Sequence, residues 1–203
     1  MTPRREVPAA RKGPGEAGRV IAGSARGIRL LAPGPGTRPF ADRVKQTLFA
    51  VLEPELPGAR VLDLFAGSGA AGIEALSRGA AAATFVERDA TAVRTVSENL
   101  RRAGLSDRAL VVRADVERWL PAAQDDAAWD LVVVDPPYAE PAVLGRVLEL
   151  LGRPGAVKPG GRVVVKHFWR DVPPARVGLL ASERERRFGE SALTFYRSGE
   201  EER

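Results

Sequence analysis

Short apolar segments alternate with amphipathic ones along most of this 203-residue chain. The apolar segments are rich in valine and leucine, which is typical of strands that are buried on both faces of a sheet. We expect such strands at residues 60–64, 83–87, 109–113, 131–134, 162–166 and 192–196. The segments between them predict helices at residues 69–77, 90–103 and 140–151, with a short helical turn at residues 116–120.

Strands that alternate with helices indicate an α/β fold, doubly wound, with a mostly parallel sheet covered on both faces. Residues 179–196 break this alternation, because two strand-like segments follow each other there without a helix between them. The last strand is therefore expected to run antiparallel to its neighbours. Together these patterns predict a Rossmann-like sheet of seven strands.

The first quarter of the chain follows a different pattern. Two short runs at residues 19–22 and 27–31 flank a turn and predict a small basic β-hairpin. Asp42 suits a helix N-cap, and the apolar residues after it fall on one helical face. Residues 1–18 contain three prolines and three glycines. We divide the chain into a flexible basic tail (1–18), a hairpin and helix extension (19–52) and a main domain (53–203).

Positive charge is concentrated in the N-terminal part. Residues 1–45 hold ten basic and three acidic side chains, a net charge of +7, whereas the whole chain carries +5. Residues 46–203 therefore carry a net charge of −2. A basic arm on a nearly neutral domain is the electrostatic pattern of a protein with a polyanionic partner, although charge that only aids solubility gives the same count.

Composition excludes several kinds of site. The chain has no cysteine, which rules out disulfides, cysteine-bound zinc and thiol catalysis, and its one histidine leaves no histidine cluster for a metal. No run of 18 apolar residues and no signal-peptide pattern is present. We expect a cytoplasmic protein without a metal.

The tetrapeptide Asp135-Pro136-Pro137-Tyr138 follows the apolar run at residues 131–134. A carboxylate at the end of a buried strand points into the crevice there, and two prolines remove two backbone donors, so the loop offers acceptors only. Tyr138 adds an aromatic face. This arrangement suits a planar base with an exocyclic amino group. A simple strand-exit turn is the alternative interpretation.

A glycine-rich loop follows the strand at residues 60–64. Gly67, Gly69 and Gly72 match the G-x-G-x-x-G pattern between a strand and a helix, where glycines let a ligand approach the backbone. Glu87 ends the next strand, where a carboxylate can hold ribose hydroxyls. This pattern alone fits NAD, FAD or S-adenosylmethionine.

Acidic residues near three strand ends favour S-adenosylmethionine. Asp63 suits the ammonium of a methionine group and would repel a pyrophosphate. Asp115 can bind an adenine amino group, with Val116 beside the ring, and Asp135 ends the fourth strand. Each of Asp63, Glu87 and Asp115 taken alone also fits a helix cap.

The chain resembles class I S-adenosylmethionine-dependent methyltransferases, and closely the bacterial family that methylates the N2 amine of a guanine in 16S ribosomal RNA. The resemblance lies in residues 19–52, 61–80, 85–89 and 132–138 and, more weakly, in residues 188–196. Gln46 departs from the pattern, because the family usually has glutamate there. The resemblance implies methyl transfer by in-line displacement, with the base held by residues 135–138.

The resemblance also implies roles for individual residues. The implied cofactor contacts are Asp63, Phe65, Gly67, Gly69, Glu87, Asp115 and Val116, with Arg38 closing the site. The implied target pocket is Asp135, Pro136, Pro137 and Tyr138. Arg38 and Pro39 equally fit a role in positioning the following helix.

RNA contact is expected from the basic extension, and the partner implied is 16S rRNA in the small ribosomal subunit or its assembly intermediate. The candidate RNA-binding residues are Arg19, Arg26, Arg29, Arg43 and Lys45. We expect a monomer that does not associate with membranes. Lys166, His167, Trp119, Trp129 and Trp169 are expected to be structural.

Three other functions share some of these features. A DNA amino-methyltransferase would use the same two motifs, but the chain has no room for a target-recognition region between its core elements. An NAD-dependent oxidoreductase would rest on the glycine loop and one histidine. A non-catalytic RNA-binding module would leave the glycine loop and Asp135 unexplained.

Overall fold

The computed structural model describes residues 15–34, 42–123, 129–137 and 140–200. Among these residues no helix combines the length and the apolar character needed to cross a membrane. The elements are, in chain order, β1 (Glu16–Arg19), β2 (Arg29–Leu31), α1 (Asp42–Leu52), the 3₁₀ turn η1 (Glu53–Glu55), β3 (Arg60–Leu64), α2 (Ala70–Ser77), β4 (Ala82–Glu87), α3 (Ala90–Ala103), the 3₁₀ turn η2 (Ser106–Arg108), β5 (Ala109–Arg113), α4 (Val116–Ala122), β6 (Trp129–Val134), α5 (Pro141–Leu151), β7 (Val157–Phe168), β8 (Arg176–Val177), β9 (Leu180–Phe188) and β10 (Ser191–Ser198).

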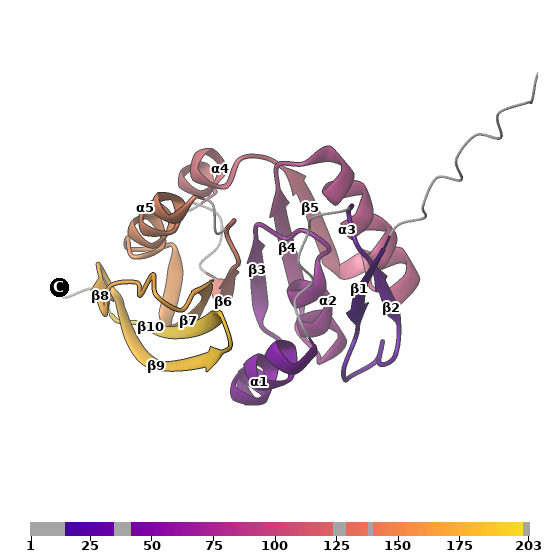
Figure 1. Cartoon of the computed structure of the whole chain (residues 1–203), viewed down its shortest axis with the longest axis horizontal. Coiled ribbons are helices and arrows are strands. Elements are labelled where there is room, and N and C mark those ends of the chain that lie inside the picture. Colours follow the sequence, from indigo (N-terminus) through magenta and orange to yellow (C-terminus); the bar gives the residue numbers. More distant parts are fainter. Residues whose placement is uncertain (1–14, 35–41, 124–128, 138–139, 201–203) are drawn as a thin grey trace, which may run out of the picture.

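The main sheet has the strand order β5-β4-β3-β6-β7-β10-β9-β8 (Figure 1). Strands β3 to β7 pair in parallel, and β10 lies antiparallel between β7 and β9. This confirms the doubly wound, mostly parallel sheet with an antiparallel last strand. The seven expected strands are present, and the two-residue strand β8 adds an eighth at the edge. The strand order reverses between β3 and β6, where open α/β sheets bind ligands.

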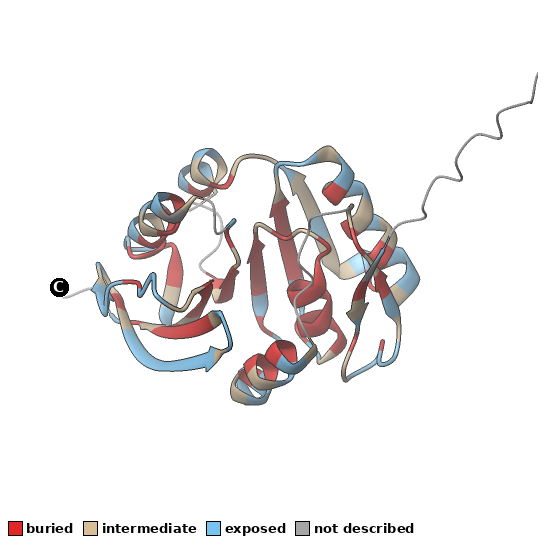
Figure 2. Cartoon of the chain, in the orientation of Figure 1, coloured by how far each residue is buried: buried red, intermediate tan, exposed pale blue. Residues whose placement is uncertain are grey.

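Helices cover both faces of the parallel strands. Helices α1, α2 and α3 pack in one apolar cluster with Val61 of β3, and α4 and α5 pack in a second cluster with Leu62, the next residue of the same strand. Successive strand residues point to opposite faces, so the central strands are apolar at most of their inner positions. Figure 2 shows the central strands buried along most of their length. The valine and leucine runs of the sequence follow from this double burial.

The N-terminal hairpin is shorter and earlier than the sequence predicts. We expected strands at residues 19–22 and 27–31, but the structure pairs β1 with β2, so the extension includes residues assigned to the tail. The reason is a buried side chain of α2. Glu74 accepts the backbone N–H groups of Ile21 and Ala22 at 2.7 and 3.0 Å. These two residues are therefore held by α2 instead of extending β1.

A second buried side chain ties the extension to the main domain. Asn99 of α3 accepts the N–H of Leu31 at 2.8 Å and donates to the Leu31 carbonyl at 3.0 Å. The same amide donates to the carbonyl of Ser68 in the glycine loop at 2.9 Å. Asn99 is fully buried, so these bonds are not exchanged with water. The extension and the glycine loop thus share one anchor.

Helix α2 lies close against β4 because of a glycine. A Cβ atom on Gly72 would lie 2.3 Å from Cε1 of the fully buried Phe85. Such a contact is far shorter than van der Waals distance, so a side chain at this position must push α2 away from the sheet. The last glycine of the motif is therefore required by packing.

We expect Gly72→Ala to lower the free energy of unfolding by roughly 1–3 kcal/mol, because the new methyl group overpacks the contact with Phe85. The matched control is Gly145→Ala in α5, where an added Cβ meets no atom within 4 Å. That variant should gain up to about 1 kcal/mol from helix propensity. Urea unfolding measures both, and equal changes in the two variants would contradict the packing argument.

Candidate active site

The carboxyl ends of β3, β4, β5 and β6 meet at one edge of the sheet, since these strands are parallel neighbours. Asp63 lies next to the end of β3, and Glu87 is the last residue of β4. Asp115 follows β5, and Asp135 follows β6 directly. The structure therefore brings all four predicted carboxylates to the same edge.

The glycine loop is held in place by Glu87. This carboxylate accepts the N–H of Gly67 at 3.0 Å and the N–H of Asp89 at 2.9 Å. Phe65, at the start of the loop, has a φ of +58°, which is an unfavourable backbone conformation for a bulky residue. Gly69 has a φ of +76° and begins α2. Strain of this kind is concentrated at functional sites.

Asp63 is almost completely buried, and its Oδ2 accepts the N–H of Gly72 at 2.9 Å. Burial raises the pKa of Asp63 to about 8, and the negative charges of Asp135 and Glu87 add to this effect, while the bond from Gly72 opposes it. A cation placed next to Asp63 would favour the ionised form of its carboxyl group.

Asp115 caps α4, because its Oδ1 accepts the N–H groups of Glu117 and Arg118 at 3.1 and 3.2 Å. Val116, the first residue of α4, is buried in the second apolar cluster. Asp115 therefore is a helix cap, which was one of the two interpretations of this residue from the sequence. Together with Asp63 and Glu87, it gives three carboxylates that fix backbone N–H groups around this edge.

Asp135 forms an ion pair that the sequence analysis missed. Both of its carboxylate oxygens accept from Nζ of Lys166 in β7, at 2.8 and 2.9 Å. The side chains are mostly buried, with 22% of Asp135 and 10% of Lys166 exposed. Burial raises the pKa of Asp135 above its ordinary value, and the positive charge of Lys166 opposes this rise. Lys166 therefore favours the ionised form of Asp135 and holds the carboxylate in place.

The sequence does contain a pattern that could have identified Lys166 as a site residue. It follows three valines at the end of a predicted parallel strand, which is the same placement that identified Asp135. Residues Val134 and Val165 are paired in the sheet, so Asp135 and Lys166 follow side by side. Only the adjacency of β6 and β7 makes this lysine part of the site.

Pro136 and Pro137 line a cavity of about 250 Å³ on the α5 side of the sheet. Leu144 and Leu148 of α5 and Phe168 of β7 form other parts of its wall. A mostly apolar cavity at the two prolines that follow Asp135 can accept a flat aromatic group. Tyr138 and Arg38 lie outside the described residues, so their predicted roles stay predictions.

The other residues expected to be structural have structural contacts. His167 is buried, with Nε2 2.9 Å from the hydroxyl of Thr194. Trp119 and Trp129 belong to the second apolar cluster, and Trp169 lies under the guanidinium of Arg187. Within the described part of the chain, no three histidine or acidic side chains gather as metal ligands would.

Four of the five predicted RNA contacts, Arg19, Arg26, Arg29 and Arg43, are exposed on the N-terminal extension and α1. Lys45 is not, and the prediction for this residue is wrong. Its side chain has no exposed surface, and its ammonium donates to the carbonyl of Arg19 and lies 3.4 Å from Asp42. Burial lowers the pKa of Lys45, and the carboxylate of Asp42 opposes this. Lys45 thus fastens the hairpin to α1.

Comparisons with known proteins give one consistent result. The family model described as Conserved hypothetical protein 95 matches residues 18–197. The Bacillus subtilis protein YlbH is 40% identical over 181 residues, which are 88% of this chain and 98% of that protein. The Escherichia coli protein named Ribosomal RNA small subunit methyltransferase D is 36% identical over 179 residues, which are 88% of each chain.

A solved structure agrees with these relatives. The Escherichia coli protein yhhF superposes with a TM-score of 0.79 at 35% identity, covering 92% of this chain and 100% of that one. The range of the family match, residues 18–197, includes most of the N-terminal extension, the glycine loop and the carboxyl edge of the sheet.

We expect Lys166→Met to raise the pKa of Asp135, because the variant removes the positive charge that opposes the effect of burial. The carboxyl ¹³C shift of Asp135, followed by NMR against pH, measures this change. Lys166→Arg keeps the charge and should keep the midpoint close to that of the wild type. A midpoint that is unchanged or lower in Lys166→Met would show that the ion pair does not control the carboxylate.

Proposed function

The chain belongs to the family described as Conserved hypothetical protein 95, and we propose that it is an rRNA methyltransferase that uses S-adenosylmethionine to methylate the N2 amine of a guanine in 16S rRNA. The observation that carries the proposal is the position of Asp135. This carboxylate follows β6, next to two prolines and beside the strand β3 that leads into the glycine loop. Its substrate is the small ribosomal subunit or an assembly intermediate of it.

The charge at the edge supports S-adenosylmethionine over a dinucleotide. Glu87 and Asp115 lie near the ends of two neighbouring strands, and a pyrophosphate would be repelled by their carboxylates. A cofactor with an ammonium and a sulfonium is attracted, and its ammonium beside the buried Asp63 would favour the ionised form of that carboxyl group. Glu87 binds the ribose hydroxyls, and Asp115 and Val116 bind the adenine. The same charges argue against an NAD-dependent oxidoreductase.

The target amine is oriented by acceptors. When bound, S-adenosylmethionine supplies a methyl carbon that its positive sulfur activates. The Asp135 carboxylate and the Pro136 carbonyl accept the two N2 protons of guanine, which turns the nitrogen lone pair toward that carbon. Prolines suit this loop because they add no N–H that would compete. Holding two reactants in such a geometry contributes roughly 7–11 kcal/mol.

The ion pair with Lys166 limits what Asp135 does. Both oxygens of Asp135 already accept from the ammonium of Lys166, so its main role is to orient the amine and to stabilise the positive charge that develops on nitrogen. In-line displacement needs placement more than a strong base, so this role is compatible with the reaction. Tyr138 is proposed to stack on the base, which returns about 1–3 kcal/mol of the unstacking cost.

A DNA amino-methyltransferase is the second candidate, because the Asp135 loop and the glycine loop serve adenine or cytosine equally well. The small-subunit rRNA methyltransferase of Escherichia coli, which this chain matches over 88% of its length, favours RNA. The exposed arginines of the N-terminal extension suit either nucleic acid, because they contact phosphates and not bases.

We expect Glu87→Ala to weaken S-adenosylmethionine binding at least about tenfold, because the variant loses the ribose acceptor and the bond that orders the loop at Gly67. Isothermal titration calorimetry measures the Kd. Glu149→Ala, an exposed position on α5, removes the same charge and should bind as the wild type does. Equal affinity of Glu87→Ala and wild type would remove Glu87 from the cofactor site.

We expect Asp135→Ala to lower methyl transfer to unmethylated small ribosomal subunits at least about 100-fold, with cofactor binding retained. Labelled methyl transfer, with recovery of N2-methylguanine from the RNA, measures the reaction. Asp130→Ala is the matched control. Asp130 lies near the amino end of β6, the strand that Asp135 follows, and its carboxylate is 2.7 Å from the ammonium of Lys158. The control variant therefore also removes an Asp–Lys pair, but at the end of the strand away from the site.

Full turnover in a folded Asp135→Ala variant would overturn the assignment of Asp135. Duplex DNA is assayed in parallel with the small subunits. Label in DNA alone would replace the ribosomal substrate but keep the chemistry. Thermal melting of both variants separates a catalytic loss from unfolding.

A further inference from the structure

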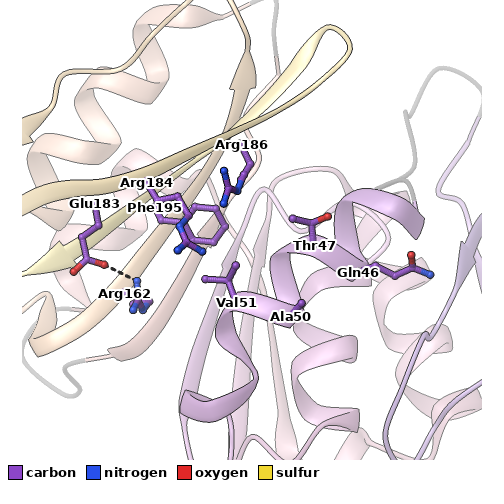
Figure 3. Close-up of a pocket in the computed structure, with 9 residues that line it drawn as sticks. All are labelled: Gln46, Thr47, Ala50, Val51, Arg162, Glu183, Arg184, Arg186 and Phe195. Carbon is purple, nitrogen blue, oxygen red and sulfur yellow. Dashed lines mark hydrogen bonds and ion pairs between the residues drawn. The ribbon is translucent and has the colours of Figure 1, made fainter.

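A groove of about 680 Å³ lies between α1 and the antiparallel strands β9 and β10 (Figure 3). Gln46 and Thr47 of α1 form one wall, and Arg184 and Arg186 of β9 form the other. Phe195 of β10 lies between these walls. The groove is on the same face of the sheet as α1, α2 and α3, because Phe195 belongs to their apolar cluster.

The strand register sorts the charges of β9. Arg184 is paired with Phe195 and Arg186 with Leu193, whose side chains both belong to the cluster on the α1 face. Paired residues of antiparallel strands point to the same face, so both arginines face the groove. Glu185, between them, points to the opposite face. Two positive charges thus stand together on one wall without an acidic residue between them.

The acids near the groove are already paired with other arginines. Glu183 accepts from Arg162 at 2.6 Å and from Arg197 at 2.9 Å, and Glu55 accepts from Arg162 at 2.8 Å. Arg184 and Arg186 form no ion pair with any residue that the structure describes. The groove therefore presents a net positive wall to a partner.

The register also connects the groove with the candidate active site. Arg186, Leu193 and Lys166 form one row across β9, β10 and β7. Two strand spacings separate the ends of this row, a distance of roughly 10 Å. Lys166 in turn holds the carboxylate of Asp135. An extended ligand in the groove would therefore lead toward Asp135.

On the other wall, α1 extends the basic surface toward the N-terminal extension. Arg43 is exposed three and four residues before Gln46 and Thr47, on the same side of the helix, and its carbonyl accepts the hydroxyl of Thr47 at 3.2 Å. Arg19 of β1 is also exposed and lies 3.6 Å from Asp42 at the start of α1. The positive groups thus run from β1 along α1 to β9.

We propose that this groove binds the phosphates of the RNA strand that flanks the target base. The inference rests on the proposed function, which requires a polyanion to lie across the sheet edge at Asp135. Arginine is suited to the task because its planar guanidinium binds a phosphate through two hydrogen bonds. Contacts of this kind position the substrate and do not read its sequence. The groove would thus add a second RNA surface beyond the N-terminal extension.

The test compares Arg184→Ala/Arg186→Ala with Arg153→Ala/Arg176→Ala. The control pair is exposed, removes the same charge and lies after α5 and in β8, away from the groove. Kinetics use unmethylated small subunits at several salt concentrations. Binding to protein-free 16S rRNA is measured by filter retention, and cofactor binding by calorimetry.

We expect the groove variant to raise KM and the Kd for protein-free RNA at least about tenfold, with kcat and cofactor affinity unchanged. The slope of log affinity against log salt should fall by roughly 0.7 for each phosphate contact that is lost. The control pair should change neither quantity.

Wild-type KM and salt slope in the groove variant would overturn the inference, as would an equal loss in the control pair. A loss with intact subunits but not with protein-free RNA would assign the groove to a ribosomal protein and would also overturn it. An inactive wild-type enzyme would instead contradict the proposed function, so the two failures are distinguishable.

Discussion

Both faces of the central parallel strands β3 and β6 are buried, so these strands accept polar side chains almost only near their ends. Val61 and Leu62 pack into different apolar clusters although they are neighbours in β3, and the same alternation holds along β6 and β7. Burial of an unpaired polar group costs several kcal/mol, which keeps charges out of these strands. The functional groups of the protein are therefore gathered at the carboxyl edge, and the chemistry follows from that placement.

Four carboxylates at one edge repel one another, and the structure offsets this with nearby positive groups. Asp63, Glu87 and Asp115 accept backbone N–H groups of the loops and helices that follow the strands. Asp135 instead accepts hydrogen bonds from the ammonium of Lys166. The difference separates their roles. In the proposed function the first three bind the cationic cofactor, whereas Asp135, paired with Lys166, orients a neutral amine.

Buried polar side chains also join the N-terminal extension to the main domain. Glu74, Asn99 and Lys45 are fully buried, and each bonds to the backbone of the extension. Asn99 reaches the glycine loop as well, through Ser68. Such groups are costly to break, so they hold the extension in one position relative to the cofactor loop. An RNA bound by the extension would thus meet the proposed active site in a fixed orientation.

The sequence by itself determined the elements whose signal is local. The order of strands and helices, the antiparallel closing strand and the carboxylates at the strand ends all follow from apolar runs and from the positions at which they stop. The glycine loop was equally visible, because its spacing and its place between a strand and a helix are both local. Direct contacts of these residues with cofactor or RNA stay predictions.

Only the tertiary structure decided which distant residues meet. Lys166 bonds to Asp135, 31 positions away in the sequence. Glu74 accepts the N–H of Ile21, 53 positions away, so that Ile21 does not extend β1. Lys45 resembles the exposed arginines in charge, yet it is buried and its ammonium donates to the carbonyl of Arg19 in the hairpin. The groove likewise needs the register of β9 against β10. Periodicity reports which face of its own element a residue occupies, whereas these contacts depend on which elements become neighbours.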